Sequence, residues 1–144
     1  MATDHFEVER EVLVAAIRTQ VSLVSAELGK PVLDERVLRA MAKVPRHEFV
    51  PAEVQVYAYV NMPLPIGHEK TISQPFVVAV MTDSLDLRPN DVVLEIGTGL
   101  GYQTAILAEL AGKVYSVELI EDLATQAKRR LGRQGYANVE IKVS

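Results

Sequence analysis

The second half of the sequence alternates short β-branched runs with helical segments, and this order is the strongest constraint on the fold. Apolar runs occupy residues 91–97 (DVVLEIG), 113–119 (KVYSVEL) and 138–143 (NVEIKV), and each has the length of a strand. Between them lie an apolar helical segment, 102–110, and a charged one, 121–134. Strands that alternate with helices in this way are typical of parallel βαβ units with right-handed crossovers. We therefore expect an α/β protein whose C-terminal part is a parallel sheet.

Three alternating glycines stand at the first junction between a strand and a helix. Gly97, Gly99 and Gly101 follow the run VLEI, so the backbone there can approach a ligand closely. The next helix offers free N–H groups and the positive end of its dipole, which favours a nucleotide-like ligand. In the dinucleotide fingerprint the last glycine comes three residues after the second, but Tyr102 holds that place here. The spacing therefore disfavours a nicotinamide dinucleotide.

Glu118 ends the second predicted strand. Doubly wound folds place a carboxylate at this position, where it accepts hydrogen bonds from both hydroxyls of a ribose. Together with the glycines, Glu118 indicates a nucleoside-binding site. The alternative interpretation is an ordinary tight turn followed by a solvated carboxylate.

The first half of the chain has the pattern of packing helices joined by a proline-rich segment. Apolar residues spaced three and four apart predict a helix over residues 5–28, which Gly29 would end. A second helix is expected after Asp34 and must end before Pro45, because proline disfavours helix in the residue before it. Five of the seven prolines fall within residues 45–75, so regular structure there should be short and broken.

A further buried helix is predicted over the apolar run 76–85, with Thr71 or Ser73 at its start and Pro75 in its first turn. No repeat or low-complexity segment interrupts the chain. We expect one domain over residues 1–144, in which a helical part with an irregular loop segment, 1–85, is followed by the part that carries the glycine turn, 86–144.

Composition places the chain among globular domains and disfavours several classes of function. A net charge of -4 argues against nucleic acid as the main ligand. With zero Cys there is no disulfide, thiolate nucleophile or cysteine zinc site, which fits a cytoplasmic location, and three scattered His predict no metal site. The acidic N-terminus does not resemble a signal peptide, and no apolar run approaches the ~20 residues that span a bilayer.

Several segments resemble a known family. Glu95 and the three glycines look like the acidic-glycine motif of S-adenosylmethionine-dependent methyltransferases, and Glu118 looks like the ribose-binding acid of that family. Four longer segments are similar to protein-L-isoaspartate O-methyltransferases of bacteria and archaea: VPRHEFVP (44–51), MPLPIG (62–67), TISQPFVVAVMT (71–82) and VLEIGTGLGYQTAILA (93–108). The resemblance covers about residues 34–143, and the TISQP segment is specific to this enzyme family.

The resemblance implies a repair enzyme that transfers a methyl group from S-adenosylmethionine to the carboxyl group of L-isoaspartyl residues in damaged proteins. In the family the serine of the TIS segment is an active-site residue, which matches Ser73 here, with Thr71 beside it. A carboxylate acceptor is already ionised at neutral pH, so catalysis should come from placement and exclusion of water instead of a general base. The cofactor contacts implied by the resemblance are Glu95, Gly97, Gly99, Gly101, Glu118 and Gln74.

Some of the polar and aromatic residues have a plainer interpretation. Ser73 stands just before a predicted helix, where a serine often only caps the helix. His47 and His68 lack partners at metal-ligand spacing, so surface exposure or hydrogen-bonded packing is expected for both. Tyr57 and Tyr59 alternate with valines and are expected on a core-facing strand or helix.

Two features depart from the family pattern. The loop before Thr71 reads GHEK, so Glu69 and Lys70 bring charge beside the expected substrate pocket. The sequence also stops at Ser144, after the third predicted strand, whereas the family continues with further strands. We therefore expect the first half of a Rossmann-like, doubly wound methyltransferase sheet, whose first strand is an unpaired apolar edge that invites self-association. The alternative function is a catalytically inactive relative that binds a nucleoside or a protein partner.

Overall fold

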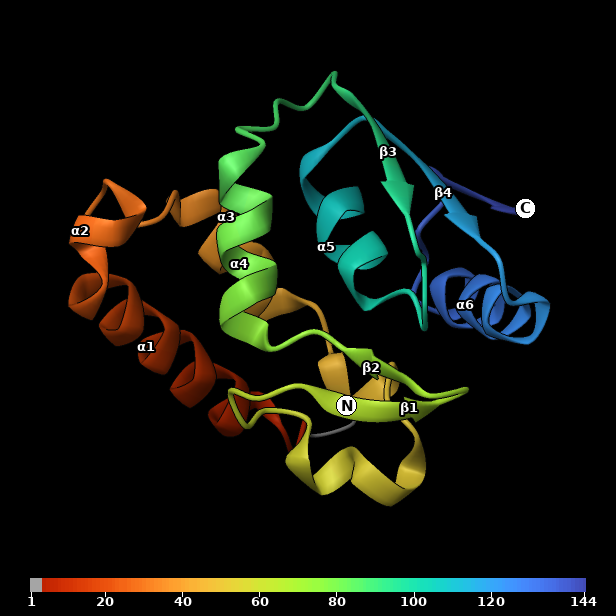
Figure 1. Cartoon of the computed structure of the whole chain (residues 1–144), viewed down its shortest axis with the longest axis horizontal. Helices are drawn as coiled ribbons and strands as arrows, with labels where there is room; N and C mark the ends of the chain where they lie inside the picture. The colour runs from red at the N-terminus through yellow and green to blue at the C-terminus, as the bar shows by residue number, and fades with distance from the viewer. Residues whose placement is uncertain (1–3) are drawn as a thin grey trace.

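The computed structural model describes residues 4–144; residues 1–3, which begin the acidic N-terminus, lie outside the described residues. A helical part with a small hairpin comes first in the chain, and a three-stranded parallel sheet with two helices follows it (Figure 1). This arrangement confirms the predicted α/β class and the helical N-terminal segment.

The helical part contains α1 (Glu7–Leu23), α2 (Ser25–Leu28), α3 (Glu35–Lys43) and α4 (Pro75–Ser84). The prediction of one continuous helix over residues 5–28 is wrong, because the helix breaks at Val24. Val24 has φ and ψ values of -110° and 25°, outside helical geometry, and the neighbouring Leu23 is 80% exposed. Val24 and Ser25 also have low intrinsic helix propensity. Gly29 ends α2 in the left-handed conformation, as expected.

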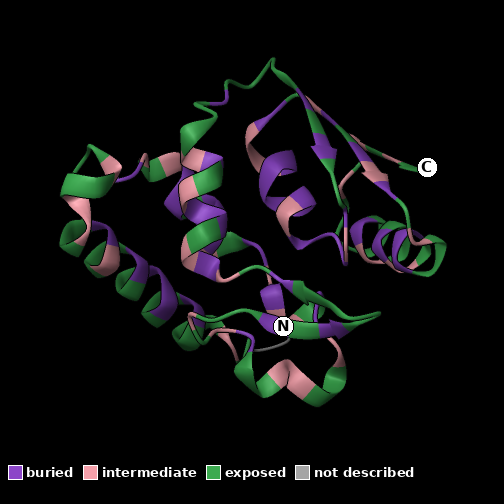
Figure 2. Cartoon of the chain, in the orientation of Figure 1, coloured by how far each residue is buried: buried purple, intermediate pink, exposed green. Residues whose placement is uncertain are grey.

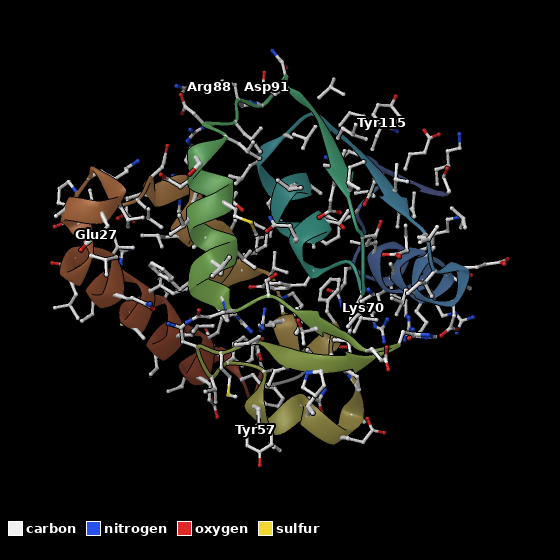
Figure 3. All side chains as sticks on the ribbon, viewed as in Figure 1. Glu27, Tyr57, Lys70, Arg88, Asp91 and Tyr115 are labelled. Carbon is white, nitrogen blue, oxygen red and sulfur yellow. The ribbon has the colours of Figure 1, made fainter. Side chains whose placement is uncertain are left out.

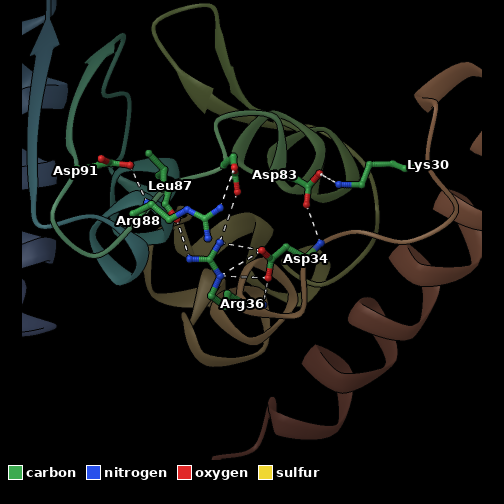
Figure 4. Close-up of polar contacts among 8 residues, drawn as sticks. Lys30, Asp34, Arg36, Asp83, Leu87, Arg88 and Asp91 are labelled. Carbon is green, nitrogen blue, oxygen red and sulfur yellow. Dashed lines mark hydrogen bonds and ion pairs between the residues drawn. The ribbon is translucent and has the colours of Figure 1, made fainter.

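A polar network joins the start of α3 to the end of α4 (Figure 4). The Asp34 carboxylate accepts from the backbone N–H of Arg36 at 2.8 Å, which confirms the predicted helix start. The Arg36 guanidinium bonded to the same carboxylate lowers the pKa of Asp34 to about 2. Asp83 of α4 in turn accepts from the Asp34 N–H and from Lys30 Nζ, both at 2.7 Å. These contacts fix the start of α3 against the end of α4.

The proline-rich segment forms only short elements, as predicted: η1 (Arg46–Glu48), η2 (Ala52–Tyr57), β1 (Leu64–Gly67) and β2 (Lys70–Ile72). Strands β1 and β2 pair as an antiparallel hairpin, which the sequence did not predict. The hairpin extends toward the sheet (Figure 1).

The aromatic residues around η2 differ from the expected core-facing pair. Tyr57 is 53% exposed and points outward in Figure 3, so the prediction for it is wrong. The 3₁₀-helix η2 ends at Tyr57, so Tyr57 and Tyr59 do not share one regular element with a common core-facing side. Tyr59 is half-buried, and its hydroxyl lies 2.7 Å from His47 Nδ1. The His47 ring also stacks on Phe6 at 4.3 Å, which confirms hydrogen-bonded packing for His47.

Helix α4 begins at Pro75 without a cap from its own preceding hydroxyl side chains. Asn61 Oδ1 accepts from the backbone N–H of Phe76 at 3.0 Å and performs the capping role from a distant loop. The interpretation of Ser73 as a helix cap is therefore wrong. The helix is also less buried than predicted, because Val77 and Met81 are exposed on its outer face.

The sheet consists of β3 (Val92–Ile96), β4 (Lys113–Glu118) and β5 (Val139–Val143), parallel and in the order β3-β4-β5. The connecting helices are α5 (Tyr102–Leu110) and α6 (Glu121–Arg133), so the predicted βαβαβ pattern is confirmed. Both helices lie on the same face of the sheet (Figure 1). Helices α3 and α4 pack against α5 and form an outer layer.

The other face of the sheet is bare. Val92, Leu94 and Ile96 of β3 are 66%, 65% and 75% exposed, although each is large and apolar (Figure 2). Within the described residues β3 pairs with β4 alone, so its second edge is unpaired, as predicted. No helix between residues 4 and 144 has the length and apolar character needed to cross a membrane.

Candidate functional site

The glycine turn that follows β3 depends on backbone conformations that favour glycine. Gly97, Gly99 and Gly101 have φ values of 92°, 57° and 96°. A Cβ on Gly101 would also lie 3.3 Å from Leu131 Cδ1, so this glycine allows the turn to pack against α6. Gly97 and Gly99 have more open surroundings and face a groove. Gly101 therefore lets the turn pack against α6, and Gly97 and Gly99 face the groove.

A groove of about 390 Å³ opens at the carboxyl ends of β3 and β4. The glycine turn and Glu118 form one wall, while Thr71 and Lys70 of the hairpin form the opposite wall. Figure 3 shows Lys70 beside the end of β3. Open α/β sheets bind ligands at the carboxyl ends of their strands, and this volume falls in the ordinary range for small molecules.

The Glu118 carboxylate is 7% exposed and holds the glycine turn. Its Oε2 accepts from the Gly99 N–H at 2.7 Å, and its Oε1 accepts from the Ile120 N–H at 2.9 Å. Each carboxylate oxygen can accept two hydrogen bonds, so both oxygens keep capacity for ligand hydroxyls. The structure thus places Glu118 in the groove, where the sequence predicted it.

Glu95 lies outside this groove, on the helix-covered face of the sheet. Its Oε1 accepts from the Thr104 hydroxyl at 2.5 Å and from the Ser116 hydroxyl at 2.6 Å. Burial raises the pKa of Glu95. These contacts tie β3 to α5 and to β4, which differs from the direct cofactor contact expected for Glu95.

The TIS segment meets the glycine turn at a second, smaller cavity of about 80 Å³. Ser73 lines this cavity, and Thr71 borders both it and the larger groove. Gly97 and Gly99 also border both spaces, so the predicted acceptor and cofactor residues share one site. Gln74 is directed elsewhere, because its Nε2 donates to the Asn61 carbonyl at 3.1 Å.

The tip of the β1–β2 hairpin reaches α6. His68 and Glu69 form its two-residue turn with φ values of 53° and 57°, which non-glycine residues rarely adopt. His68 Nε2 lies 3.0 Å from Asp122 Oδ2 in the first turn of α6. This contact fits the expected hydrogen-bonded packing of His68 and ties the hairpin tip to α6. No local pattern signals it, because the two residues lie 54 positions apart.

Sequence reasoning missed one buried residue beside the site. Arg46 is 0% exposed, and its Nη2 donates to the Ser73 carbonyl at 3.0 Å. The available signal was a charged residue inside the otherwise apolar start of VPRHEFVP. Across residues 4–144, no group of three His, Asp or Glu side chains is arranged to hold a metal ion.

A glycine turn and an acidic residue at the ends of adjacent parallel strands are characteristic of Rossmann-like nucleotide-binding folds. A family model described as protein-L-isoaspartate(D-aspartate) O-methyltransferase matches residues 19–144. The chain therefore belongs to the protein-L-isoaspartate(D-aspartate) O-methyltransferase family.

Two curated relatives illustrate the similarity. Protein-L-isoaspartate O-methyltransferase 1 of Polaromonas sp. (strain JS666) is 62% identical over 143 residues, which cover 99% of this chain and 61% of the relative. Protein-L-isoaspartate O-methyltransferase 2 of Syntrophobacter fumaroxidans is 52% identical over 141 residues, which cover 98% of this chain and 57% of that relative. The chain thus spans about three fifths of the length of these relatives.

Solved structures show the same fold. A protein-L-isoaspartate O-methyltransferase aligns with a TM-score of 0.78 and 26% identity, over 94% of this chain and 42% of its own. A putative protein-L-isoaspartate O-methyltransferase from Plasmodium falciparum, in complex with S-adenosyl-L-homocysteine, aligns with a TM-score of 0.69 and 20% identity. That match covers 90% of this chain and 62% of the other. The predicted partial methyltransferase sheet is therefore confirmed.

Proposed function

We propose that this chain serves methyl transfer from S-adenosylmethionine to the carboxyl group of L-isoaspartyl residues in damaged proteins. The observation that carries the proposal is the single site where the glycine turn, Glu118 and the TIS segment meet. Family membership supports the choice of reaction. The named activity belongs to relatives of which the chain spans about three fifths, and we extend it to this chain as our proposal.

The groove residues fit the proposed cofactor, S-adenosylmethionine. The free acceptor capacity of Glu118 suits the two hydroxyls of a ribose, and the Cβ-free surfaces of Gly97 and Gly99 allow close approach of the rest of the nucleoside. When bound, S-adenosylmethionine would supply a methyl group from its positively charged sulfur: the sulfur–methyl bond breaks as a carboxylate oxygen bonds the methyl group, and S-adenosyl-L-homocysteine and a neutral ester result. We assign cofactor contacts to Gly97, Gly99 and Glu118, and supporting roles to Glu95, Gly101 and Gln74.

The hairpin side of the site suits the acceptor. Thr71 and Ser73 are exposed, and their hydroxyls can donate hydrogen bonds that orient a carboxylate. Lys70 adds a positive charge to the same wall of the groove. An ionised carboxylate needs no proton removed before it reacts, so the task of these residues is placement.

The remaining expectations stay predictions. Residues 1–85 would serve the substrate side and residues 86–144 the cofactor side of one partial domain. We expect isoaspartyl peptides and proteins as partners, no nucleic acid or membrane partner, and a cytoplasmic location. The bare face and free edge of β3 favour self-association of this chain.

The same bare edge gives the alternative function its support. A chain that binds the nucleoside but only self-associates, or binds a protein partner, would be a catalytically inactive relative. A radiolabelled methyl-transfer assay with an isoaspartyl peptide separates the two functions. S-adenosyl-L-homocysteine binding without methyl transfer by the 144-residue chain would favour the inactive relative.

Calorimetric titration with S-adenosyl-L-homocysteine and with NAD tests the cofactor assignment. We expect S-adenosyl-L-homocysteine to bind more tightly, and Glu118→Ala to cost about 1.5 to 3 kcal/mol of its binding free energy. Glu27→Ala is the matched control, because Glu27 is exposed on α2, far from the groove in Figure 3. Tighter binding of NAD, or an unchanged affinity in Glu118→Ala, would contradict the proposal.

Substitution of the TIS serine tests the acceptor assignment. In a methyl-transfer assay we expect Ser73→Ala to lower turnover of an isoaspartyl peptide much more than it lowers S-adenosyl-L-homocysteine affinity. Ser22→Ala, at an exposed position of α1, is the control. Parallel losses of thermal stability and activity in Ser73→Ala would instead indicate a purely structural role.

A further inference from the structure

Arg46 is the largest of the fully buried side chains, and it lies directly behind the acceptor end of the site. Its Nη2 donates to the Ser73 carbonyl at 3.0 Å. Its Cζ lies 4.8 Å from the centre of the Tyr102 ring, at the start of α5. The guanidinium therefore joins the TIS segment to the helix that follows the glycine turn.

The positive charge of Arg46 has no counter-ion in the part of the chain that the structure describes. Its Nε and Nη1 have no hydrogen-bond partner, and no carboxylate forms an ion pair with it. Burial lowers the pKa of Arg46, but a guanidinium stays protonated in proteins. An unpaired buried charge is costly, and native proteins rarely keep one without a reason.

The residues that contact Arg46 border a cavity in which a counter-ion could lie. Both of its contacts, Ser73 and Tyr102, line the small cavity of about 80 Å³ beside the glycine turn. Gln103 lines the same cavity, and its Oε1 is also buried without a partner. Gln103 therefore brings one unsatisfied polar atom to this cavity, and Arg46 lies behind two of the residues that line it.

We propose that Arg46 is a positioning residue for the acceptor: it holds the Ser73 backbone, and its uncompensated charge is balanced by the carboxylate of an L-isoaspartyl residue seated at Ser73. The inference rests on the proposed function and deepens its acceptor side. Arg46 acts through Ser73 and does not touch the acceptor, since its side chain is fully buried. The methyl ester product is neutral, so the same charge favours binding of the acceptor over the product.

The test compares Arg46→Met with the unmodified 144-residue chain. Methionine is similar in length and apolar, and replacement of buried charges by apolar residues of similar volume is often neutral or stabilising. We therefore expect the midpoint of thermal unfolding to stay the same or rise. A purely structural role for Arg46 predicts that the midpoint falls.

Ligand binding supplies the second readout. The probes are a short peptide with one L-isoaspartyl residue, its L-aspartyl isomer, and S-adenosyl-L-homocysteine, each titrated by calorimetry. We expect Arg46→Met to weaken binding of the isoaspartyl peptide by about tenfold, because a buried positive charge behind the site and the bond that holds the Ser73 backbone are both lost, and to leave S-adenosyl-L-homocysteine affinity unchanged. Arg46→Lys keeps the charge and should restore most of the peptide affinity. Arg129→Met, an exposed arginine on α6, should change nothing.

The outcomes separate this inference from the proposed function. Failure of the unmodified chain to bind S-adenosyl-L-homocysteine would count against the proposed function. If that ligand binds, three results overturn the role of Arg46: a lowered unfolding midpoint in Arg46→Met, equal peptide affinity in Arg46→Met and the unmodified chain, or no preference of the unmodified chain for the isoaspartyl peptide.

Discussion

The two faces of the β3-β4-β5 sheet have opposite surroundings, although the same strands form both. On the face covered by α5 and α6, Val93 is 8% exposed and Val114 is 0% exposed. On the bare face, Leu94 is 65% exposed. Successive side chains of a strand point to opposite faces, so a single residue step moves a side chain from the core to the solvent. Apolar composition alone therefore does not show which residues of β3 stabilise the fold.

The difference teaches where stability and association reside in this molecule. The covered face includes a cluster of Leu87, Val93, Leu107, Ala108, Ala111 and Val114, which packs α5 on the sheet. The bare face has apolar area of similar kind but no cover within the described residues. The covered face should set the free energy of unfolding, and the bare face should set the tendency to associate.

The largest expected effect comes from a truncation on the covered face. Leu107→Ala should lower the free energy of unfolding by about 2 to 5 kcal/mol, because it removes buried methyl groups and leaves a cavity. Leu107 is 3% exposed. Urea denaturation measures the change. A loss below about 1 kcal/mol would show that the covered face is not a tightly packed core.

A polar substitution on the same face should have a smaller effect. Glu95→Ala leaves the hydroxyls of Thr104 and Ser116 without their shared acceptor. We expect a loss of about 1 to 3 kcal/mol in the free energy of unfolding, the usual range for orphaned buried polar groups. The S-adenosyl-L-homocysteine affinity of the folded variant should change little. A large loss of affinity with unchanged stability would mean that Glu95 contacts the cofactor directly.

The pH dependence of stability tests whether the Glu95 carboxyl group is buried in the folded protein. Burial raises its pKa, so the folded state holds the proton more tightly than the unfolded state does. The free energy of unfolding should therefore fall as pH rises above the ordinary value of 4.5. Glu95→Gln should lack this contribution when urea denaturation is repeated from that pH to neutrality. Asp34 does not interfere, because its pKa of about 2 makes its contribution disappear only at lower pH.

The smallest change in stability is expected on the bare face. Leu94→Ala should alter the free energy of unfolding by no more than about 0.5 kcal/mol, because the side chain is already in solvent. It should also reduce the fraction of associated species in size-exclusion chromatography. Leu23→Ala is the matched control, since Leu23 is 80% exposed on α1, away from the sheet. Equal effects of the two substitutions would count against the bare face as the site of association.

Features that depend on short sequence patterns were predictable. The β-branched runs define β3, β4 and β5, and the three glycines mark positions with positive φ. Glu118 could be placed because it is the last residue of β4. Local pattern and the family resemblance together therefore predicted that the glycine turn and Glu118 lie near each other, and both border one groove in the structure.

Features that depend on distant partners were not predictable from the sequence. The cap of α4 comes from Asn61, and the hairpin tip is fixed by the pair His68 and Asp122. Arg46 has no local signal for its contact with Ser73, 27 positions away.

The direction of the Glu95 side chain, in contrast, was available from strand periodicity, because Glu95 and the buried Val93 are two residues apart and share a face.

The hydrogen bonds of Glu118 have a consequence for the entropy of ligand binding. Both of its oxygens are fixed by backbone N–H groups of residues 99 and 120 before any ligand arrives. Ordering a flexible side chain on binding usually costs about 0.5 to 1.5 kcal/mol. In this fold that rotational freedom is lost when the chain folds, so a ribose meets a carboxylate that is already oriented.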